Sequence, residues 1–302
     1  MVLAGVAAPL VRKRVSTPPL LVQTVAFGAP VGLCVAMRRS RGRDVATCCL
    51  QMWSYVAAYK TPHDDPDAQQ HRVHVRYPIV ADRILGLGEL PSVRLQRALA
   101  RTGIDGAEWR ALDRVLVWAH WSWFAVPHGT LVYIMLRHRR RFTRAATMTY
   151  AVFDIGASFY WLVPTAPPWY AAARAEAGEE TLAVRRMMVE YGEFFWRDGW
   201  GSLYSVFGGN PLAAMPSLHF ATSVMAALLL AETGTFAGLL GFTYALTLGF
   251  ALVYLGEHYL VDLLAGVALT GAVRRLAPRA TGPLQRAAGV VSRLEEIAHG
   301  GV

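Results

Sequence analysis

The chain has 302 residues, of which 54% are hydrophobic and 17% charged, and its mean hydropathy is +0.30. This composition excludes an intrinsically disordered or collagen-like chain and argues against an ordinary water-soluble protein. The 30 Lys and Arg against 21 Asp and Glu give a formal net charge of +9. That excess is compatible with nucleic acid, an anionic membrane surface or basic cytoplasmic loops.

The arginines lie in short clusters between apolar runs, not along one polar domain. These clusters are RRSRGR at 38–43, RHRRRFTR at 137–144 and RRLAPR at 274–279. This distribution is the positive-inside pattern of a protein with several membrane spans. We expect no nucleic-acid partner, because no zinc-ligand spacing, aromatic RNA-binding signature or basic helix accompanies the charge. The three cysteines have no CxxC spacing, so they predict neither a disulfide framework nor a zinc site.

Seven apolar segments predict membrane-spanning helices, since a span needs about 20 largely apolar residues. They cover residues 20–37, 45–59, 111–136, 143–163, 216–232, 236–255 and 259–273. A basic cluster at 12–14 precedes the first segment without a clean cleavage site, so we expect an uncleaved span. Arginines flank this segment on both sides. The sequence therefore leaves open whether one of the first two segments lies in the membrane interface.

Two longer polar regions, 60–110 and 164–215, interrupt the spans. We expect both on one face of the bilayer, outside, because the Arg-rich link at 137–144 and the Arg-rich tail from 274 are then both cytoplasmic. Within the first region, residues 79–100 mix apolar residues with spaced arginines. This stretch predicts either a helix in the headgroup layer or a solvated helix packed on the bundle.

Two histidines and one aspartate stand at the ends of predicted spans. His219 lies in AMPSLHFATS, and His258 and Asp262 lie in YLGEHYLVDLLAG. The spacing of four places the second imidazole and the carboxylate on one helix face, about 6 Å apart at their Cβ atoms. The acid can then hold the ring in one tautomer.

The chain between the two histidines predicts a helical hairpin. Apolar runs at 220–232 and 236–255 form two helices about 27 Å long, which return His258 to the face where His219 begins. An ionisable residue such as Asp262 inside a span costs up to about 3 kcal/mol and persists mainly when it is paired or functional. The alternative interpretation is that the second histidine and the aspartate only cap a helix and anchor it at the interface.

These motifs resemble those of the type 2 phosphatidic acid phosphatase superfamily, especially its branch near inositol phosphorylceramide synthase. PSLH at 216–219 is similar to the family's proline-serine-x-histidine motif. YLGEHYLVD at 254–262 is similar to its second histidine motif, with the aspartate four residues on. YWLVPTAPPWY at 160–170 resembles the aromatic and proline-rich segment of the actinobacterial members. The resemblance covers about residues 110–275.

The resemblance implies phosphoryl transfer through a phosphohistidine, with His258 as nucleophile, Asp262 orienting it and His219 as general acid. The residue chemistry agrees, because a neutral imidazole is nucleophilic near pH 7, a carboxylate stabilises the resulting cation and a second imidazole can carry the proton. Ser217 is a candidate hydrogen-bond donor to the phosphate, and its alternative role is the N-cap of the following helix. This chemistry requires no metal and no organic cofactor.

The sequence departs from the phosphatase pattern at the cationic motifs. Leu252 stands six residues before the second histidine, where phosphatase members usually carry an arginine, and no lysine-arginine-proline motif is recognisable. Phosphoryl transfer needs cationic stabilisation of the equatorial oxygens, so other residues must supply it. The candidates in the 164–215 region are Arg174, Arg185, Arg186 and Arg197, each of which is otherwise a solvated surface charge.

The leucine at this position also occurs in the synthase-like branch, which transfers the phosphoryl headgroup to a lipid alcohol. That favours transfer modestly, and the choice between hydrolase and transferase stays open. His128 and Tyr160 are further candidate substrate contacts. His120 and His128 lie eight residues apart within one predicted span and share a helix face approximately. They either line the substrate cavity or are buried and hydrogen-bonded to another helix.

Two other classes of function remain open at this point. Two histidines and a carboxylate also suit an iron or zinc ion, although no pattern of further carboxylates that would orient such ligands accompanies them. Alternatively, the pocket holds a lipid headgroup without chemistry, as in a transporter or scaffold.

We therefore expect an all-α, polytopic membrane helix bundle, with the six-helix core that the resemblance implies and an extra N-terminal segment. The predicted parts are an N-terminal segment with one or two spans (1–60), an interfacial or extracytoplasmic connection (61–110), a catalytic membrane core (111–275) and a cytoplasmic tail (276–302). The implied partners are a lipid phosphate or phospholipid, the bilayer and, for a transferase, a lipid alcohol. Composition and resemblance suggest a bacterial plasma membrane, with the active site facing the extracytoplasmic side.

Overall fold

The computed structural model describes residues 1–15, 17–60, 72–100, 109–174, 183–207, 210 and 212–300. All regular elements within these ranges are helices, which confirms the all-α prediction. Extended pairing there is limited to isolated bridges that join His74 to Thr165 and Thr165 to Ala213. The predicted connection 61–110 lies partly outside the described residues. The chain divides into two compact units, Met1–Asp64 with Ala272–Val302, and Asp65–Gly271.

The first unit consists of three helices and the later part of a fourth. These are α1 (Val2–Val15), α2 (Pro19–Ala36), α3 (Arg41–Lys60) and the residues of α15 (Leu260–Ala298) from Ala272 onward. The Ser54 hydroxyl in α3 donates to the Ala26 carbonyl of α2 at 2.7 Å. Glu295 of α15 accepts hydrogen bonds from Arg39 and Arg43, both at 3.0 Å. The far end of α15 is thereby tied to the turn between α2 and α3.

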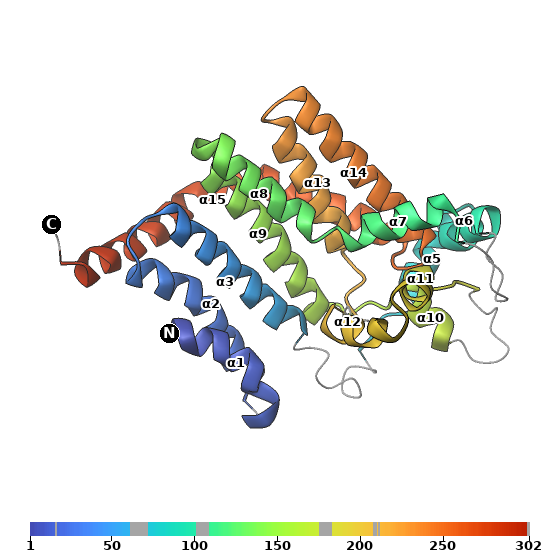
Figure 1. The fold of residues 1–302 in the computed structure, drawn as a ribbon, viewed down its shortest axis with the longest axis horizontal. Helices are drawn as coiled ribbons and strands as arrows, with labels where there is room; N and C mark the ends of the chain where they lie inside the picture. Colours follow the sequence, from blue (N-terminus) through green and yellow to red (C-terminus); the bar gives the residue numbers. More distant parts are fainter. Residues whose placement is uncertain are drawn as a thin grey trace. The chain divides into compact units, whose positions relative to one another are not determined.

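The second unit contains all the other helices and the start of α15. Its helices are α5 (Arg76–Leu85), α6 (Pro91–Leu99), α7 (Ala111–Trp121), α8 (Ala125–Arg137), α9 (Arg139–Leu162), α10 (Pro168–Arg174), α11 (Met187–Trp196), the 3-10 turn η2 (Arg197–Gly199), α12 (Trp200–Phe207), α13 (Leu218–Ala231) and α14 (Thr235–Tyr254). Figure 1 shows α13 and α14 side by side, and the short helices α5, α6, α10, α11 and α12 grouped at one end of this unit.

The α13–α14 hairpin is closely packed through small residues. A Cβ atom added at Gly238 would lie 2.8 Å from the Cα of Ala231, and one added at Gly241 would lie 2.8 Å from the Cα of Ala227. Small residues let the two backbones approach, as is common between helices in membranes. The hairpin predicted from the sequence is therefore present, and it returns the end of α14 to the start of α13.

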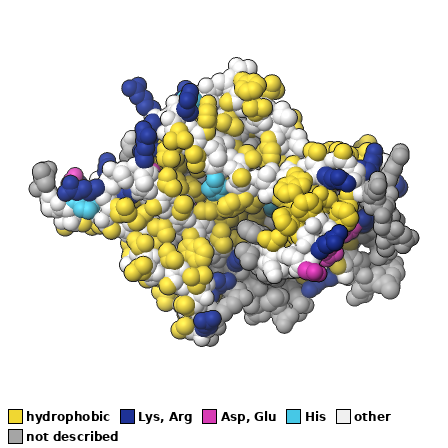
Figure 2. All heavy atoms as spheres, viewed as in Figure 1, with side chains coloured by type: hydrophobic (Ala, Val, Ile, Leu, Met, Phe, Trp, Pro, Cys, Tyr) yellow, Lys and Arg dark blue, Asp and Glu magenta, His cyan; other side chains and the backbone are white. Residues whose placement is uncertain are grey.

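Within the described ranges, two helices, α2 and α14, are long and apolar enough to cross a membrane by length and composition. The exposed side chains of α14 include Phe236, Leu239 and Leu246, and Figure 2 shows hydrophobic side chains over much of the viewed face. An apolar surface of this kind is unfavourable in water and suits contact with lipid or another protein. The number of spans and the six-helix membrane core stay predictions.

The predicted single helix over 111–136 is wrong, because the structure breaks it into α7 and α8. The turn between them is closed by hydrogen bonds from Trp123 N to His120 O at 3.1 Å and from Ala125 N to Ser122 O at 3.0 Å. Pro127 then falls in the first turn of α8, where a residue without an N–H is tolerated. His120 and His128 consequently lie on different helices and share no helix face.

The predicted end of the last span at residue 273 is also wrong as a helix boundary. α15 continues to Ala298 and passes through Pro278 and Pro283. Hydropathy falls after the predicted boundary, but the following residues include many Ala, Leu, Arg and Glu, which favour a helix whether or not it is buried. The hydropathy pattern therefore marked the end of the apolar stretch and not the end of the helix.

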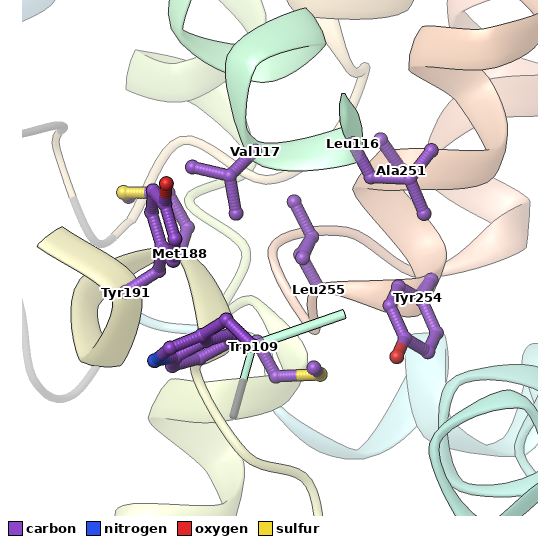
Figure 3. Packing of buried hydrophobic residues seen from close by; sticks show 9 residues of the cluster. Trp109, Leu116, Val117, Met188, Tyr191, Ala251, Tyr254 and Leu255 are labelled. Carbon is purple, nitrogen blue, oxygen red and sulfur yellow. The ribbon is translucent and has the colours of Figure 1, made fainter. Parts of the chain in front are cut away.

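A buried apolar cluster joins α11 to α7 and to the end of α14, as Figure 3 shows. Its members are Trp109, Leu116, Val117, Met187, Met188, Tyr191, Ala251, Tyr254 and Leu255. In addition, Met187 N donates to the Leu255 carbonyl at 3.2 Å. The chain just before α11 is therefore held against the turn that follows α14, and that turn carries His258.

Candidate functional site

The two histidine motifs meet in the second unit. His219 lies in the first turn of α13, and His258 lies in the turn between α14 and α15. His219 Nδ1 is 3.2 Å from His258 Nε2, and His258 Nδ1 is 3.2 Å from Asp262 Oδ2. The three side chains form one continuous hydrogen-bonded row. The hairpin of α13 and α14 produces this meeting, because it brings residues 39 positions apart to one end of the helix pair.

The turn before His258 depends on a glycine. Gly256 has a φ of +79°, and a Cβ atom there would lie 2.5 Å from the carbonyl oxygen of Arg185. Glycine takes this left-handed conformation without steric cost, whereas other residues resist it. The turn is thus shaped by both the backbone conformation and the neighbouring segment.

Asp262 holds His258 in a defined tautomer. Both side chains are buried, with relative exposures of 0% and 4% respectively. Asp262 Oδ2 also accepts the backbone N–H of Tyr259 at 2.9 Å, which fixes the carboxylate. A carboxylate next to Nδ1 accepts a proton from it, so the lone pair of the ring stays on Nε2. In that tautomer, His258 Nε2 accepts a hydrogen bond from His219 Nδ1.

Ser217 and Tyr160 support the first histidine motif. Ser217 caps α13, since its hydroxyl accepts the N–H of Phe220 at 3.4 Å. Its backbone N–H donates to the Asp262 carbonyl at 3.0 Å, so the two motifs are joined directly. The Tyr160 hydroxyl donates to the Pro216 carbonyl at 2.9 Å. The structure therefore places both candidate residues at the motif, with the N-cap role of the serine realised.

The His219 ring contacts two aromatic rings from the α7–α8 region. It stacks on His120 with centroids 5.1 Å apart, and the Trp123 ring centroid lies 4.2 Å from its own. Trp123 is itself held, because its Nε1 donates to Thr222 Oγ1 at 2.9 Å. Among the described residues, His120 Nδ1 has no hydrogen-bond partner. Of the two histidines of WAHWSWFAVPH, the structure thus brings His120 to the site.

One arginine of the predicted set lies beside the histidine turn. Arg186 Nε is 3.0 Å from the carboxylate of Glu257, the residue directly before His258 in the chain. The guanidinium of Arg186 lies 3.6 Å from the centroid of the Trp169 ring. Burial acts to lower the pKa of Arg186, but the carboxylate of Glu257 more than offsets this, and the pKa is raised. The guanidinium is therefore a fixed, permanently charged cation at the edge of the site.

The other predicted binding residues contact groups outside the histidine pair. Arg185 pairs with Glu190. Arg174 lies over the Tyr170 ring at 4.4 Å. His128 Nδ1 is 2.7 Å from the Phe124 carbonyl. Arg197 is exposed on the 3-10 turn.

The sequence analysis missed Trp123 and Glu257. Glu257 offered one signal, its place directly before His258. Trp123 offered none, because its approach to His219 depends on the break between α7 and α8. As for metal, the described residues contain no group of three His, Cys, Asp or Glu side chains arranged to hold an ion.

The sequence model of one protein family matches residues 97–276, and its description is the PAP2 superfamily. The matched segment contains both histidine motifs and covers more than half of the 302 residues. Neither the curated proteins nor the solved structures contain a match to this chain. The family match agrees with the site geometry, which joins the two motifs through Ser217 and the histidine pair. The chain belongs to the PAP2 superfamily.

Proposed function

We propose that the protein is a membrane enzyme that transfers or hydrolyses the phosphoryl group of a lipid through a phosphohistidine intermediate. The observation that carries the proposal is the row from Asp262 through His258 to His219, with both links at 3.2 Å. Membership of a superfamily whose members are generally phosphatases supports the same chemistry. No cofactor is needed, because the imidazole supplies the nucleophile.

The first step forms a bond between His258 Nε2 and phosphorus. The ring nitrogen contributes its lone pair, the bond from phosphorus to the leaving oxygen breaks, and that oxygen takes the Nδ1 proton of His219, which begins the step as an imidazolium and becomes neutral. The His258 ring becomes cationic while its Nδ1–H stays on Asp262. A buried carboxylate stabilises this cation more strongly than one in water would, since the local dielectric is low.

The second step releases the phosphoryl group from the ring. An acceptor hydroxyl attacks phosphorus, the N–P bond breaks, and the acceptor's proton passes to His219, which restores both rings. Water as acceptor makes the protein a hydrolase, and a lipid alcohol makes it a transferase of the inositol phosphorylceramide synthase type. The leucine at 252 in place of an arginine favours the transferase.

The phosphoryl group requires more room than the present distance between the two rings. At 3.2 Å between Nδ1 and Nε2, no phosphorus atom fits between them. His258 is buried and fixed by Asp262, whereas His219 is partly exposed and held mainly by stacking on His120 and Trp123. We therefore expect His219 to rotate and His258 to stay in place when substrate binds.

Arg186 is the cation proposed to bind the phosphoryl oxygens. Its guanidinium is partly buried, oriented by Glu257 and Trp169, and next to the turn that carries the nucleophile. A planar guanidinium can bind two phosphate oxygens at once, which a lysine cannot do. This role fills the place of the arginine that the family usually carries before the second histidine.

The membrane setting of the proposal rests on α2, on α14 and on the family. We propose a multi-pass protein of the bacterial plasma membrane, with the histidine pair facing the extracytoplasmic side. The arginine-rich link at 137–144 then lies in the cytoplasm. Substrate would enter from the outer leaflet as a lipid phosphate or phospholipid.

The test uses the purified full chain with a panel of phospholipids and polyprenyl phosphates, each with and without an added lipid alcohol. Free phosphate identifies a hydrolase, and label that moves between lipids identifies a transferase. We expect His258→Ala to abolish turnover and Arg186→Lys to reduce it about 10²-fold, the usual cost of losing one charge-stabilising group. His138→Ala, at the α8–α9 turn, is the matched control.

Two results would overturn the proposal. If EDTA abolishes turnover and a divalent ion restores it, the reaction depends on a metal. If His258→Ala retains the cellular activity of the wild type, the protein binds or moves lipid without phosphoryl chemistry.

A further inference from the structure

Two buried polar side chains of α5 and α6 contact the chain on both sides of His258. Asp82 in α5 has a relative exposure of 0%, and Gln96 in α6 has one of 6%. Both precede residues 97–276, the segment that matches the family. The histidine motifs therefore do not account for them, and each has to be explained by its own contacts.

Asp82 binds the start of α15. Its Oδ2 accepts the backbone N–H of Leu260 at 2.9 Å, and its Oδ1 accepts that of Val261 at 2.8 Å. The first N–H groups of a helix have no partner within the helix and need an acceptor. Here the acceptor comes from a segment almost 180 residues away in the chain. The first turn of α15, which carries Asp262, is thus positioned by α5.

Gln96 binds the end of α14 and the chain before α11. Its Nε2 donates to the carbonyl oxygens of Arg185 and Tyr254, both at 2.9 Å, and its Oε1 accepts the N–H of Arg185 at 2.9 Å. One amide side chain therefore connects the residue before Arg186 to the last residue of α14. It holds the proposed phosphate-binding arginine and the start of the histidine turn in one register.

Asp262, in the first turn of α15, does not accept the N–H groups of Leu260 and Val261. It holds His258 and accepts the N–H of Tyr259 through Oδ2 alone, and its Oδ1 has no hydrogen-bond partner among the described residues. A capping residue at the helix start would be the cheaper solution for stability, because a buried carboxylate is costly to desolvate. An acceptor on another helix, here Asp82 of α5, also fixes the distance between that helix and α15, which a cap within α15 would not do.

We propose that Asp82 and Gln96 are positioning residues that hold the 254–262 turn from both ends and so set the line of attack of His258. This proposal rests on the proposed function, since the turn carries the nucleophile. Neither side chain touches the reacting atoms. Their effect is on the placement of Nε2, and a misplacement of about 1 Å lowers catalysis about 10²-fold.

The first test separates placement from binding by steady-state kinetics. We use phosphatidic acid in detergent micelles as the probe and compare Asp82→Asn and Gln96→Met with the wild type. Asparagine keeps the size of Asp82 but turns one acceptor into a donor that faces an N–H. Methionine keeps the length of Gln96 without its three hydrogen bonds. We expect kcat to fall 10- to 100-fold while KM changes less than about 3-fold.

Two exposed residues in the later part of α15 provide matched controls. Glu296→Gln removes a carboxylate, and Gln285→Met removes an amide, at positions that are exposed. Both should keep kcat within 2-fold of the wild type. Gln96→Glu keeps the acceptor for Arg185 N but places a second oxygen against two carbonyl oxygens, so we expect a loss at least as large as that of Gln96→Met. Equal kcat in the Asp82 and Gln96 variants and in the controls would overturn the proposal.

A second measurement does not depend on turnover. Diethyl pyrocarbonate modifies accessible, unprotonated imidazoles, and mass spectrometry reports the extent at each histidine. His258 is buried and hydrogen-bonded at both nitrogens, so we expect slow modification in the wild type. It should be severalfold faster in Asp82→Asn and Gln96→Met, with His138 as internal reference. Unchanged modification of His258 refutes the positioning role, whereas failure of the wild type to turn over any lipid phosphate refutes the proposed function alone.

Discussion

The Asp262 carboxylate makes both of its hydrogen bonds through one oxygen atom. Its Oδ2 lies 3.2 Å from His258 Nδ1 and accepts the N–H of Tyr259, and its Oδ1 has no hydrogen-bond partner among the described residues. An amide in its place would keep the volume and lose the charge. It would also offer a donor to His258 Nδ1, which favours the tautomer with the proton on Nε2.

For Asp262→Asn we expect kcat to fall about 10²- to 10⁴-fold, because the ring is then held in the wrong tautomer and its cation is not stabilised. KM should change little, since Asp262 does not touch the lipid. Initial rates on the active lipid of the panel measure this, with exposed Asp198→Asn as control. A fall of less than 3-fold would show that His258 is not the nucleophile.

Asp82 makes stability depend on pH in a defined direction. Its pKa is raised from 3.8 to about 6, chiefly by burial and also by the neighbouring Asp262, although the N–H groups of Val261 and Leu260 act to lower it. The native state therefore binds this proton more tightly than the unfolded state. The contribution of Asp82 to stability is greatest below about pH 4 and declines as the pH rises through 6.

We therefore expect the melting temperature of the wild type to fall relative to that of Asp82→Asn between pH 5 and pH 7. Asp262 and Tyr259 face the same region, so both proteins are compared at each pH and only the difference is interpreted. Thermal melts in one detergent and one buffer series measure it. If the melting-temperature difference between the wild type and Asp82→Asn stays constant, or if the wild type gains relative to the variant as the pH rises, the pKa of Asp82 is not raised.

At the scale of elements, α15 approaches the first histidine motif closely. A Cβ atom at Gly266 would lie 2.7 Å from the Ser217 carbonyl and 3.3 Å from Ala221 N. Both neighbours are backbone atoms, so they cannot move aside without shifting a helix. Gly271, on the same helix, has no atom within 4 Å of an added Cβ.

Gly266→Ala should accordingly destabilise the protein by about 1–3 kcal/mol, the usual cost of overpacking, and lower kcat by separating Ser217 from Asp262. Gly271→Ala should be neutral or stabilise by up to about 1 kcal/mol, because alanine favours the helix. Denaturation of both variants under identical conditions provides the comparison. Similar stabilities for the two variants would show that the helices do not approach this closely.

The elements also show where sequence patterns predict structure well. The α13–α14 hairpin was predictable, because two apolar runs joined by a short polar turn have few other arrangements. The break between α7 and α8 was not, because Ser122, Trp123 and Phe124 are compatible with a helix and hydropathy does not change there. It results from the turn hydrogen bonds and from the position of Pro127.

For the whole molecule, membrane topology is the property that links the site to its substrate. All three cysteines lie in α2 and α3. Replacing them gives a cysteine-free chain, into which one cysteine at a time can be introduced for labelling. Leu87, between α5 and α6, is 88% exposed. Arg140 is exposed in the arginine-rich link.

We expect a membrane-impermeant maleimide to label Leu87→Cys in intact cells and to label Arg140→Cys only after the cells are opened. This result follows if α5 and α6 accompany the histidine pair outside and the arginine-rich link is cytoplasmic. The protein should also stay with membranes after an alkaline carbonate wash. The reverse labelling pattern would place the site on the cytoplasmic side.

The sequence by itself determined the helical class and the paired histidine motifs. Hydropathy, the four-residue spacing of His258 and Asp262, and the hairpin between the motifs are local properties, and local properties are readable from one chain. Only the tertiary structure shows which other side chains lie beside the two motifs: Arg186 of the four arginines, His120 and not His128, and the distant Asp82 and Gln96. These contacts join segments far apart in the chain, and such contacts depend on how helices pack, which no local pattern encodes.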